Sequence, residues 1–230
     1  MRYSASSQDL DAAGVKVPWW LYAGTRSLAH WINQRMWHVD VERRWLVPEF
    51  GPIIIAPVHR SFIDFFITSE VTNRPVAFMA KNELWKYHLP ARFLEAFGAF
   101  PVNRTGVDRK ALERAEGILK AGGTLILFPE GTRRSGDAVT SLHEGAAFLA
   151  ARTGAVVVPV ALTGTEQIMP KGTRIPKRMP VKIVVGRPVQ APVSEGGSRI
   201  RRSELAKATE AIKEARQATF DEVNLPHSRF

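Results

Sequence analysis

The sequence predicts an α/β fold, in which a mostly parallel central sheet is flanked by helices on both faces. Short apolar runs of strand length alternate with stretches of helical length along the whole chain. No internal repeat or low-complexity tract interrupts this alternation. With 230 residues, of which 45% are hydrophobic and 23% charged, the chain is long enough for one sizeable α/β domain.

The N-terminal region is expected to form an amphipathic helical motif over residues 1–38, followed by the α/β domain over residues 39–230. The helix itself is predicted over 17–38, starting at Pro18, which suits a first helical turn. Five of the six tryptophans lie in this helix or shortly after it, with basic residues between them. Trp prefers places with one wet edge, so this clustering is unlike that of an ordinary core.

The first strands and helices of the domain follow from their apolar runs. PIIIAPV at 52–58 is apolar without alternation, which is typical of a strand buried on both faces. Residues 62–72 are predicted to be helical, and PVAFM at 75–79 forms a second strand. A helix over 83–97 should break near Pro90, because proline removes a hydrogen bond in a helix interior.

The middle of the chain repeats the pattern. GAFPVNR at 98–104 is strand-like and leads to a polar turn. A helix over 107–121 has its apolar residues on one face and stops at Gly122 and Gly123. TLILF at 124–128 is predicted as a third central strand.

The last third contains two more helices and two strands. A helix from about 141 to 153 precedes the strand VVVPVAL at 156–162, and VKIVV at 181–185 forms the last strand. VSEGGS at 193–198 is interpreted as a loop inside the domain, and residues 200–220 form a charged C-terminal helix.

Composition limits the possible functions. The absence of cysteine excludes disulfides, Cys-based zinc sites and a thiol nucleophile, and it fits a reducing compartment. The first residues lack the basic and apolar regions of a signal peptide. No run reaches the roughly 18 apolar residues of a spanning helix, and the best candidate, at 17–25, is halted by Arg26.

The net charge of +10 and the pI of about 10.3 fit three partners: nucleic acid, an anionic membrane surface or anionic small molecules. Charge alone does not choose among them. A nucleic-acid-binding module needs a basic stripe with interleaved aromatics or a reading motif. The sequence contains no zinc spacing, RNP pattern or Walker loop, so no nucleic-acid partner is expected.

The polar turn after the first strand carries His59 and Asp64 in HxxxxD spacing. On one continuous helix they would lie about 140° apart, so they can meet only if His59 precedes the helix. Asp64 would then hold one imidazole nitrogen and leave the other as a general base. Alternatively, Ser61 and Asp64 fit a capping box that closes the helix start. The two roles are compatible.

The turn after the third central strand, FPEGTR, suits an anion site. Pro129 ends the strand pairing, and Gly131 lets the backbone approach a ligand closely. The N–H groups of the turn and Arg133 would then bind a phosphate-sized anion. The alternative is a surface corner at which Glu130 and Arg133 pair with each other.

Two further cations, Lys81 and Arg104, also follow predicted strands. Ligands of open parallel sheets bind beyond the carboxyl ends of the strands. His59, both cations and the FPEGTR turn are therefore expected at one rim, although each cation alone could be a solvated loop residue. A base beside a cationic pocket of phosphate size describes acyl transfer to a phosphorylated alcohol.

Four segments in order resemble the glycerophospholipid acyltransferase family typified by 1-acylglycerol-3-phosphate acyltransferase (PlsC-like). They are HRSFID at 59–64, GAFPVNR at 98–104, FPEGTR at 128–133 and VVPVAL at 157–162. The resemblance covers about residues 40 to 190. It departs from the family pattern at Val58, where many members have Asn, and at His143 and Glu144, where many have a Lys-rich segment; Arg134 adds a cation.

The resemblance implies transfer of a fatty acyl group from acyl-CoA, or from an acyl carrier protein, to the free hydroxyl of a lysophosphatidate. The product would be phosphatidate, in phospholipid synthesis. His59 would be the general base and Asp64 would orient it. The implied substrate-binding residues are Lys81, Arg104, Glu130, Gly131, Thr132, Arg133 and Pro159. Acyl-CoA is a co-substrate, and no metal or cofactor is expected, because a thioester reacts readily once it is positioned.

Because such substrates are lipids, the resemblance also implies a membrane surface as partner, with the N-terminal helix lying on it at the cytoplasmic face of the cell membrane. The basic loop at 171–178 would add attraction to anionic lipid, or would simply be solvated. The alternative for the tryptophans is packing onto the domain. Alternative acceptors are glycerol-3-phosphate, a glycolipid or another lysophospholipid. A non-catalytic lipid-binding protein is disfavoured by the intact HxxxxD.

Overall fold

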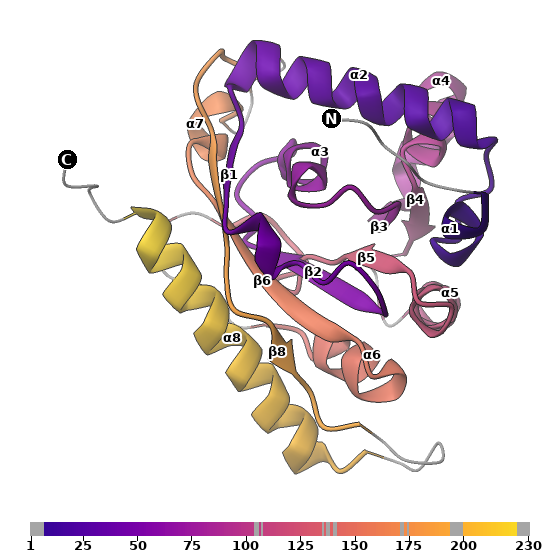
Figure 1. The fold of residues 1–230 in the computed structure, drawn as a ribbon, viewed down its shortest axis with the longest axis vertical. Helices are drawn as coiled ribbons and strands as arrows, with labels where there is room; N and C mark the ends of the chain where they lie inside the picture. The colour runs from indigo at the N-terminus through magenta and orange to yellow at the C-terminus, as the bar shows by residue number, and fades with distance from the viewer. Residues whose placement is uncertain are drawn as a thin grey trace.

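The computed structural model describes residues 7–103, 106, 108–134, 136, 139, 142–170, 173, 175–193 and 200–224, with only the backbone at 7–9, 89 and 90. Within these residues the chain forms a central sheet with helices on both faces (Figure 1). The predicted fold class is therefore confirmed.

The sheet contains eight strands among the described residues, in the order β1-β7-β6-β2-β5-β3-β4, with β8 also paired to β6. The strands are β1 (Asp40–Glu42), β2 (Ile53–Pro57), β3 (Val76–Lys81), β4 (Ala99–Val102), β5 (Thr124–Ile126), β6 (Val156–Leu162), β7 (Lys182–Val185) and β8 (Val189–Gln190). Only β6–β7 and β6–β8 pair antiparallel there, so the described sheet is mostly parallel.

Helices cover both faces. They are α1 (Ser7–Ala12), α2 (Trp19–Trp37), α3 (Asp64–Thr68), α4 (His88–Ala96), α5 (Arg109–Lys120), α6 (Gly145–Thr153), α7 (Thr165–Ile168) and α8 (Arg202–Asn224). Short 3₁₀ turns are η1 (Arg44–Leu46), η2 (Ser69–Val71) and η3 (Asn82–Lys86). Figure 1 shows α2 and α8 on opposite sides of the sheet.

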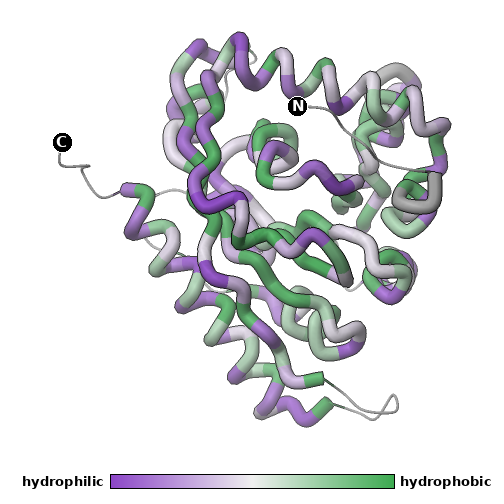
Figure 2. The backbone as a smooth tube through the Cα atoms, in the orientation of Figure 1, coloured by the Kyte–Doolittle hydropathy of each residue, from purple (hydrophilic) through white to green (hydrophobic). Residues whose placement is uncertain are grey.

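Two apolar cores lie against the two faces of the sheet. Ile53 and Ile55 of β2 pack in one core with residues of α2, α3 and α4, whereas Ile54 packs in the other with α5, α6 and α8. Successive strand side chains point to opposite faces, so a strand buried on both sides needs apolar residues throughout. Figure 2 accordingly shows green along the central strands, while purple and green alternate along α8.

Helix α2 is part of the first core. Its inward residues recur at helical spacing and are Tyr22, Arg26, Ala29, Asn33 and Trp37. The fully buried Arg26 donates hydrogen bonds to the carbonyls of Ser69 (2.7 Å) and Thr72 (3.0 Å). Helix α2 is thus fixed to the segment that follows α3, and the division of the chain at residue 38 stays a prediction.

Some element boundaries differ from the prediction. The break expected near Pro90 lies at Tyr87, between η3 and α4, and Pro90 belongs to the first turn of α4. The first N–H groups of a helix have no intrahelical acceptor, so proline costs no hydrogen bond there. Helix α6 begins at Gly145 rather than 141, and residues 62–72 divide into α3 and η2. The predicted loop at 193–198 lies, apart from Val193, outside the described residues.

Candidate active site

The turn between β2 and α3 (residues 58–63, here called the β2 turn) brings His59 against Asp64. His59 Nδ1 lies 3.0 Å from Asp64 Oδ2. Because a carboxylate only accepts hydrogen bonds, Nδ1 carries the proton in this contact, and Nε2 of the neutral imidazole keeps its lone pair. The His59 side chain is 13% exposed, whereas that of Asp64 is fully buried. The expected geometry, with His59 on the turn before the helix, is confirmed.

Asp64 also organises the backbone of this turn. Its Oδ2 accepts hydrogen bonds from the N–H groups of Arg60 and Ser61, each at 2.6 Å. The bond from Ser61 is one half of the predicted capping box. The other half is absent, because the buried Ser61 Oγ has no hydrogen-bond partner among the described residues. One oxygen of Asp64 thus holds both the imidazole and the turn, but the helix begins at Asp64 with Ile63 as its N-cap, so the predicted capping box is only half formed.

The turn after β5 (residues 127–134, here called the β5 turn) lies directly beside the β2 turn. Strands β2 and β5 are parallel neighbours, with Ile55 opposite Ile126. The Phe128 ring lies 4.2 Å from the His59 ring, centroid to centroid. The N–H of Arg134 donates to the His59 carbonyl over 3.0 Å. The two motifs, about seventy residues apart in sequence, thus meet at the carboxyl ends of adjacent strands.

Glu130 is buried and does not pair with Arg133 at the surface, so that alternative is wrong. Its Oε2 accepts the His59 N–H over 2.8 Å, and its Oε1 accepts a hydrogen bond from Arg216 over 2.8 Å. The side chain is 1% exposed. Both carboxylate oxygens are thus bound by protein donors, and Glu130 lies on the buried side of the His59 backbone.

Arg216 of α8 is a site residue that the sequence interpretation missed. It is fully buried, and burial lowers the pKa of its guanidinium, while the charge of Glu130 opposes this change. A signal was present in the sequence. The inward face of α8 is Ala208, Ile212, Arg216, Thr219, Phe220 and Val223. An arginine on an otherwise mostly apolar stripe indicates a buried polar partner.

The anion-binding candidates of the β5 turn are open to solvent. Thr132 and Arg133 are exposed, and Gly131 adopts φ +67°. A Cβ at Gly131 would lie 2.9 Å from the ring of His143, so the turn needs glycine for its conformation and for its space. An exposed cation and hydroxyl beside a partly exposed imidazole can bind an anionic group next to the base.

The remaining predicted residues are placed less centrally. Lys81 ends β3 at the same rim, but it is half-exposed and pairs with Glu83 over 2.9 Å. Arg104 lies outside the described residues. Pro159 is buried inside β6, opposite Ala56 of β2. It therefore lies in the strand that supports the turn, and its predicted contact with substrate stays a prediction.

Strand pairing explains how a central strand tolerates Pro159. Strand β6 pairs with β8 at residues 156–157 and with β7 at residues 160–162. The Pro159 carbonyl accepts from Gly186 on this side, so its nitrogen also faces the gap between the two partners. No ladder bond is lost by the missing N–H.

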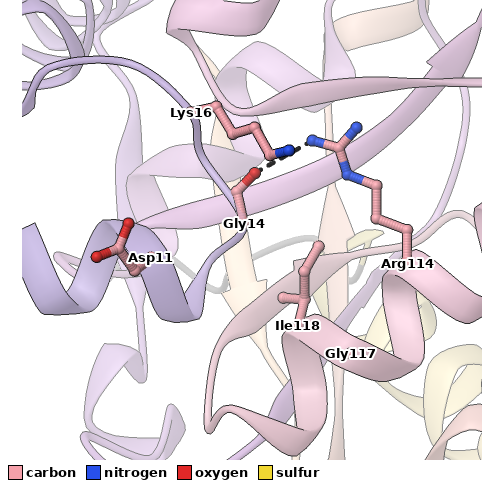
Figure 3. Close-up of a pocket in the computed structure, with 6 residues that line it drawn as sticks. All are labelled: Asp11, Gly14, Lys16, Arg114, Gly117 and Ile118. Carbon is pink, nitrogen blue, oxygen red and sulfur yellow. Dashed lines mark hydrogen bonds between the residues drawn. The ribbon is translucent and has the colours of Figure 1, made fainter.

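Two hollows lie at the opposite rim of the sheet. They have volumes of about 310 and 190 Å³ and share Gly14, Lys16 and Arg114. The smaller one reaches Gly98 and Ala99, at the amino end of β4. Figure 3 shows Lys16 and Arg114 pointing toward each other, with Arg114 bonded to the Gly14 carbonyl over 3.1 Å. The catalytic candidates follow the carboxyl ends, so these hollows are not part of the site.

Two absences concern only the part of the chain that the structure describes. There, no group of three or more His, Cys, Asp or Glu side chains is arranged to bind a metal ion. Within the same residues, no helix is both long and apolar enough to cross a bilayer.

Comparison with known proteins identifies the relatives of this chain. A family model described as Acyltransferase matches residues 38–163. A 1-acyl-sn-glycerol-3-phosphate acyltransferase of Bacillus subtilis is 31% identical over 179 residues, which cover 76% of this chain and 85% of the relative. The chloroplastic LPAT1 of Arabidopsis thaliana, with the same enzyme name, is 28% identical over 160 residues, 68% of this chain. This chain covers only 45% of the plant protein.

The fold is also similar to that of a solved structure. The 1-acyl-sn-glycerophosphate acyltransferase PlsC of Thermotoga maritima superposes with a TM-score of 0.72 at 24% identity. The match covers 96% of this chain and 89% of the other. At this level of identity the likeness supports the fold.

Proposed function

Because this chain belongs to the Acyltransferase family, we propose that it transfers a fatty acyl group from acyl-CoA to the free hydroxyl of a lysophosphatidate, giving phosphatidate. The observation that carries the proposal is the position of His59. Its Nδ1 is held by Asp64, and the neighbouring β5 turn exposes Thr132 and Arg133. The enzyme names of the bacterial and plant relatives support the same acceptor.

The proposed reaction needs no covalent enzyme intermediate. His59 Nε2 takes the proton of the acceptor hydroxyl while the hydroxyl oxygen attacks the thioester carbonyl carbon. The tetrahedral intermediate then expels the CoA thiolate, which takes the proton back from the imidazolium. Asp64 stabilises the imidazolium between these two steps, because its carboxylate lies 3.0 Å from Nδ1.

The acceptor phosphate is proposed to bind the β5 turn. Arg133 supplies charge, and Gly131 and Thr132 supply close backbone approach and a hydroxyl. Arg104 and Lys81 would complete the pocket, and Pro159 would form part of its wall. Glu130 would contribute indirectly, by accepting the hydrogen bond of the His59 N–H.

Helix α2 is proposed to bring the enzyme to the membrane. Trp20 and Trp31 are each 62% exposed and lie eleven residues apart, which places them on one outer face, with Leu28 beside them. Trp37, in contrast, is buried in the core and donates a hydrogen bond to the Lys177 carbonyl. The packing alternative thus holds for Trp37, whereas the outward tryptophans suit a headgroup layer at the cytoplasmic face.

The test of the enzyme activity is thiol release by purified protein. We expect release with lysophosphatidate and at least one acyl-CoA from a panel of chain lengths, or with acyl carrier protein as the donor. The alternative acceptors to be assayed in parallel are glycerol-3-phosphate, a glycolipid and a lysophospholipid without a phosphomonoester. Replacing His59→Ala should lower turnover by about 10²–10⁴-fold while lipid binding remains. No release with any donor and acceptor would refute the proposal.

The membrane role has a separate test. We expect the wild-type protein to sediment with anionic vesicles. A Trp20→Ser, Trp31→Ser double variant should sediment with them more weakly. A Trp85→Ser variant, altered outside α2, is the control. Equal vesicle binding by all three proteins would show that α2 is not the contact.

A further inference from the structure

Helix α8 lies outside the segment matched by the family model, which ends at residue 163. Nevertheless it packs along β6 and β7 and directs two side chains of one face toward the β2 turn. These are Arg216 and, four residues later, Phe220. Residues four apart lie one above the other on a helix, so both can act on the same turn.

Arg216 is bonded to the end of β2, immediately before the β2 turn. Its Nη2 donates to the carbonyl of Pro57 over 2.7 Å, and its Nε donates to the carbonyl of Ala56 over 3.2 Å. Pro57 is the second residue before His59, and Ala56 is the third. The guanidinium therefore fixes the direction in which the chain leaves the strand.

The same Nη2 is also linked to the β2 turn, through Glu130. It donates to Glu130 Oε1 over 2.8 Å, and Glu130 Oε2 accepts the His59 N–H over 2.8 Å. Arg216 is thus linked to the backbone of His59 by one carboxylate. The backbone on both sides of Val58 is held by the same buried guanidinium.

The chemistry of these contacts requires an arginine. The planar guanidinium presents donors in a fixed fork, whereas a lysine has one nitrogen on a flexible stem. Two carbonyls and one carboxylate at separate positions suit the fork. The pair is almost completely buried, with side chains 0% and 1% exposed, so each charge depends on the other for its burial.

Phe220 adds a second contact from the same helix. Its ring centroid lies 4.7 Å from the guanidinium carbon of Arg60. The N–H of Arg60 is in turn held by Asp64, over 2.6 Å. Helix α8 therefore braces the β2 turn at His59 and at the next residue.

We propose that Arg216 is a positioning residue for acyl transfer: through Glu130 and the carbonyls that precede the β2 turn, it sets the orientation of His59 without touching either substrate. This inference rests on the proposed function for its kinetic effect. The competing explanation is that Arg216 only balances the buried charge of Glu130, so that its loss would destabilise the fold without a specific effect on His59.

The kinetic test compares Arg216→Met with Arg152→Met. Arg152 also forms an Arg–Glu pair, with Glu116 over 2.9 Å, but it joins α6 to α5. Both variants are assayed below their melting temperatures, with rates normalised to the folded fraction. We expect Arg216→Met to lower kcat by about 10–100-fold, as misplacement of a catalytic group does, with KM changed far less. Arg152→Met should keep the wild-type kcat.

A lysine variant supports the same test. Arg216→Lys keeps the charge opposite Glu130 but loses the fork, so we expect it to fold and still to have a reduced kcat. If Arg216→Met does not fold, Arg216→Lys decides by the same criterion. A wild-type kcat in the folded variant would overturn the proposal.

Amide hydrogen exchange separates failure of this inference from failure of the proposed function. The His59 N–H is bound by Glu130, so in Arg216→Met its exchange should accelerate more than that of α5 amides. This measurement needs no substrate and remains decisive if the wild-type protein releases no thiol. Unchanged exchange at His59, or equal acceleration in α5, would show that Arg216 is not a positioning residue.

Discussion

Two buried carboxylates, Asp64 directly after the β2 turn and Glu130 in the β5 turn, are held in different ways. The partners of Asp64 are His59, Arg60 and Ser61, all within five residues of it. The partners of Glu130 are 71 and 86 residues away, in the β2 turn and in α8. The carboxylate of Asp64 is held by local partners, whereas that of Glu130 depends on tertiary contacts.

This difference separates two kinds of functional residue. A locally organised carboxylate can act on the chemistry while the rest of the fold stays unchanged. A carboxylate held by distant elements connects the chemistry to the packing of those elements. Changes in the two turns should therefore differ in how far stability and activity fall together.

The largest effect is expected from Asp64→Asn, directly after the β2 turn. The amide keeps the size of the side chain but removes the charge that supports the imidazolium, so kcat should fall by about 10²–10⁴-fold. Because all its partners are local, we expect the far-UV circular dichroism spectrum to be retained. Thiol release measures kcat, and far-UV circular dichroism with thermal unfolding shows whether the fold is retained. A kcat within a few-fold of wild type would mean that Asp64 only closes the turn.

A smaller effect is expected from Arg133→Ala in the β5 turn. Loss of a charge-assisted contact to the acceptor phosphate should lower kcat/KM by about 10–100-fold, from about 1.5–3 kcal/mol. The loss should concern phosphomonoester acceptors and should be much weaker with lysophosphatidylcholine. Arg134→Ala is the comparison, since the backbone of Arg134, rather than its side chain, bonds to His59. Equal losses with both acceptors would argue against a phosphate contact.

Gly131→Ala tests the shape of the β5 turn. The new Cβ meets the His143 ring at 2.9 Å, and the backbone keeps a positive φ that disfavours alanine. We expect a loss of about 1–2 kcal/mol of unfolding free energy and a several-fold lower activity. Gly117→Ala in α5 is a matched control, because its Cβ meets nothing within 4 Å and alanine favours helices. Urea unfolding should give opposite signs for the two variants.

The smallest effect concerns Asp108, a second carboxylate with local partners. The N–H groups of Asn103 and Ala111, at 2.9 and 3.0 Å, hold the pKa of Asp108 below its usual value. Its contribution to stability is therefore present above the unfolded pKa of about 3.9 and is lost as the pH falls through the folded pKa. Asp108→Asn does not titrate.

We therefore expect the urea midpoint of the wild type, relative to that of Asp108→Asn, to stay constant near neutral pH. In acid, the wild-type midpoint should fall relative to that of the variant. The difference should be small, because the carboxylate is exposed to solvent. A difference that does not change with pH would show that this carboxylate contributes no pH dependence.

Much of the site could be predicted from the sequence because its signals are local. Apolar runs placed the central strands, and the HxxxxD spacing before a helix predicted that His59 meets Asp64. The turn chemistry of Gly131 was also readable, because a tight corner after a strand requires a permissive backbone. Pro90 was misjudged because the effect of proline depends on where the helix begins, and that boundary is weakly encoded.

The sequence by itself determined the alternation of strands and helices and the presence of two polar turns, since hydrophobic period and turn chemistry act over a few residues. The sequence also indicated that the two turns share one rim, but only the tertiary structure decided which atoms bond across long separations. The strand order places β2 beside β5, and α8 then closes over them to pair Arg216 with Glu130. That pairing depends on burial of two charges in one core, which no local spacing specifies.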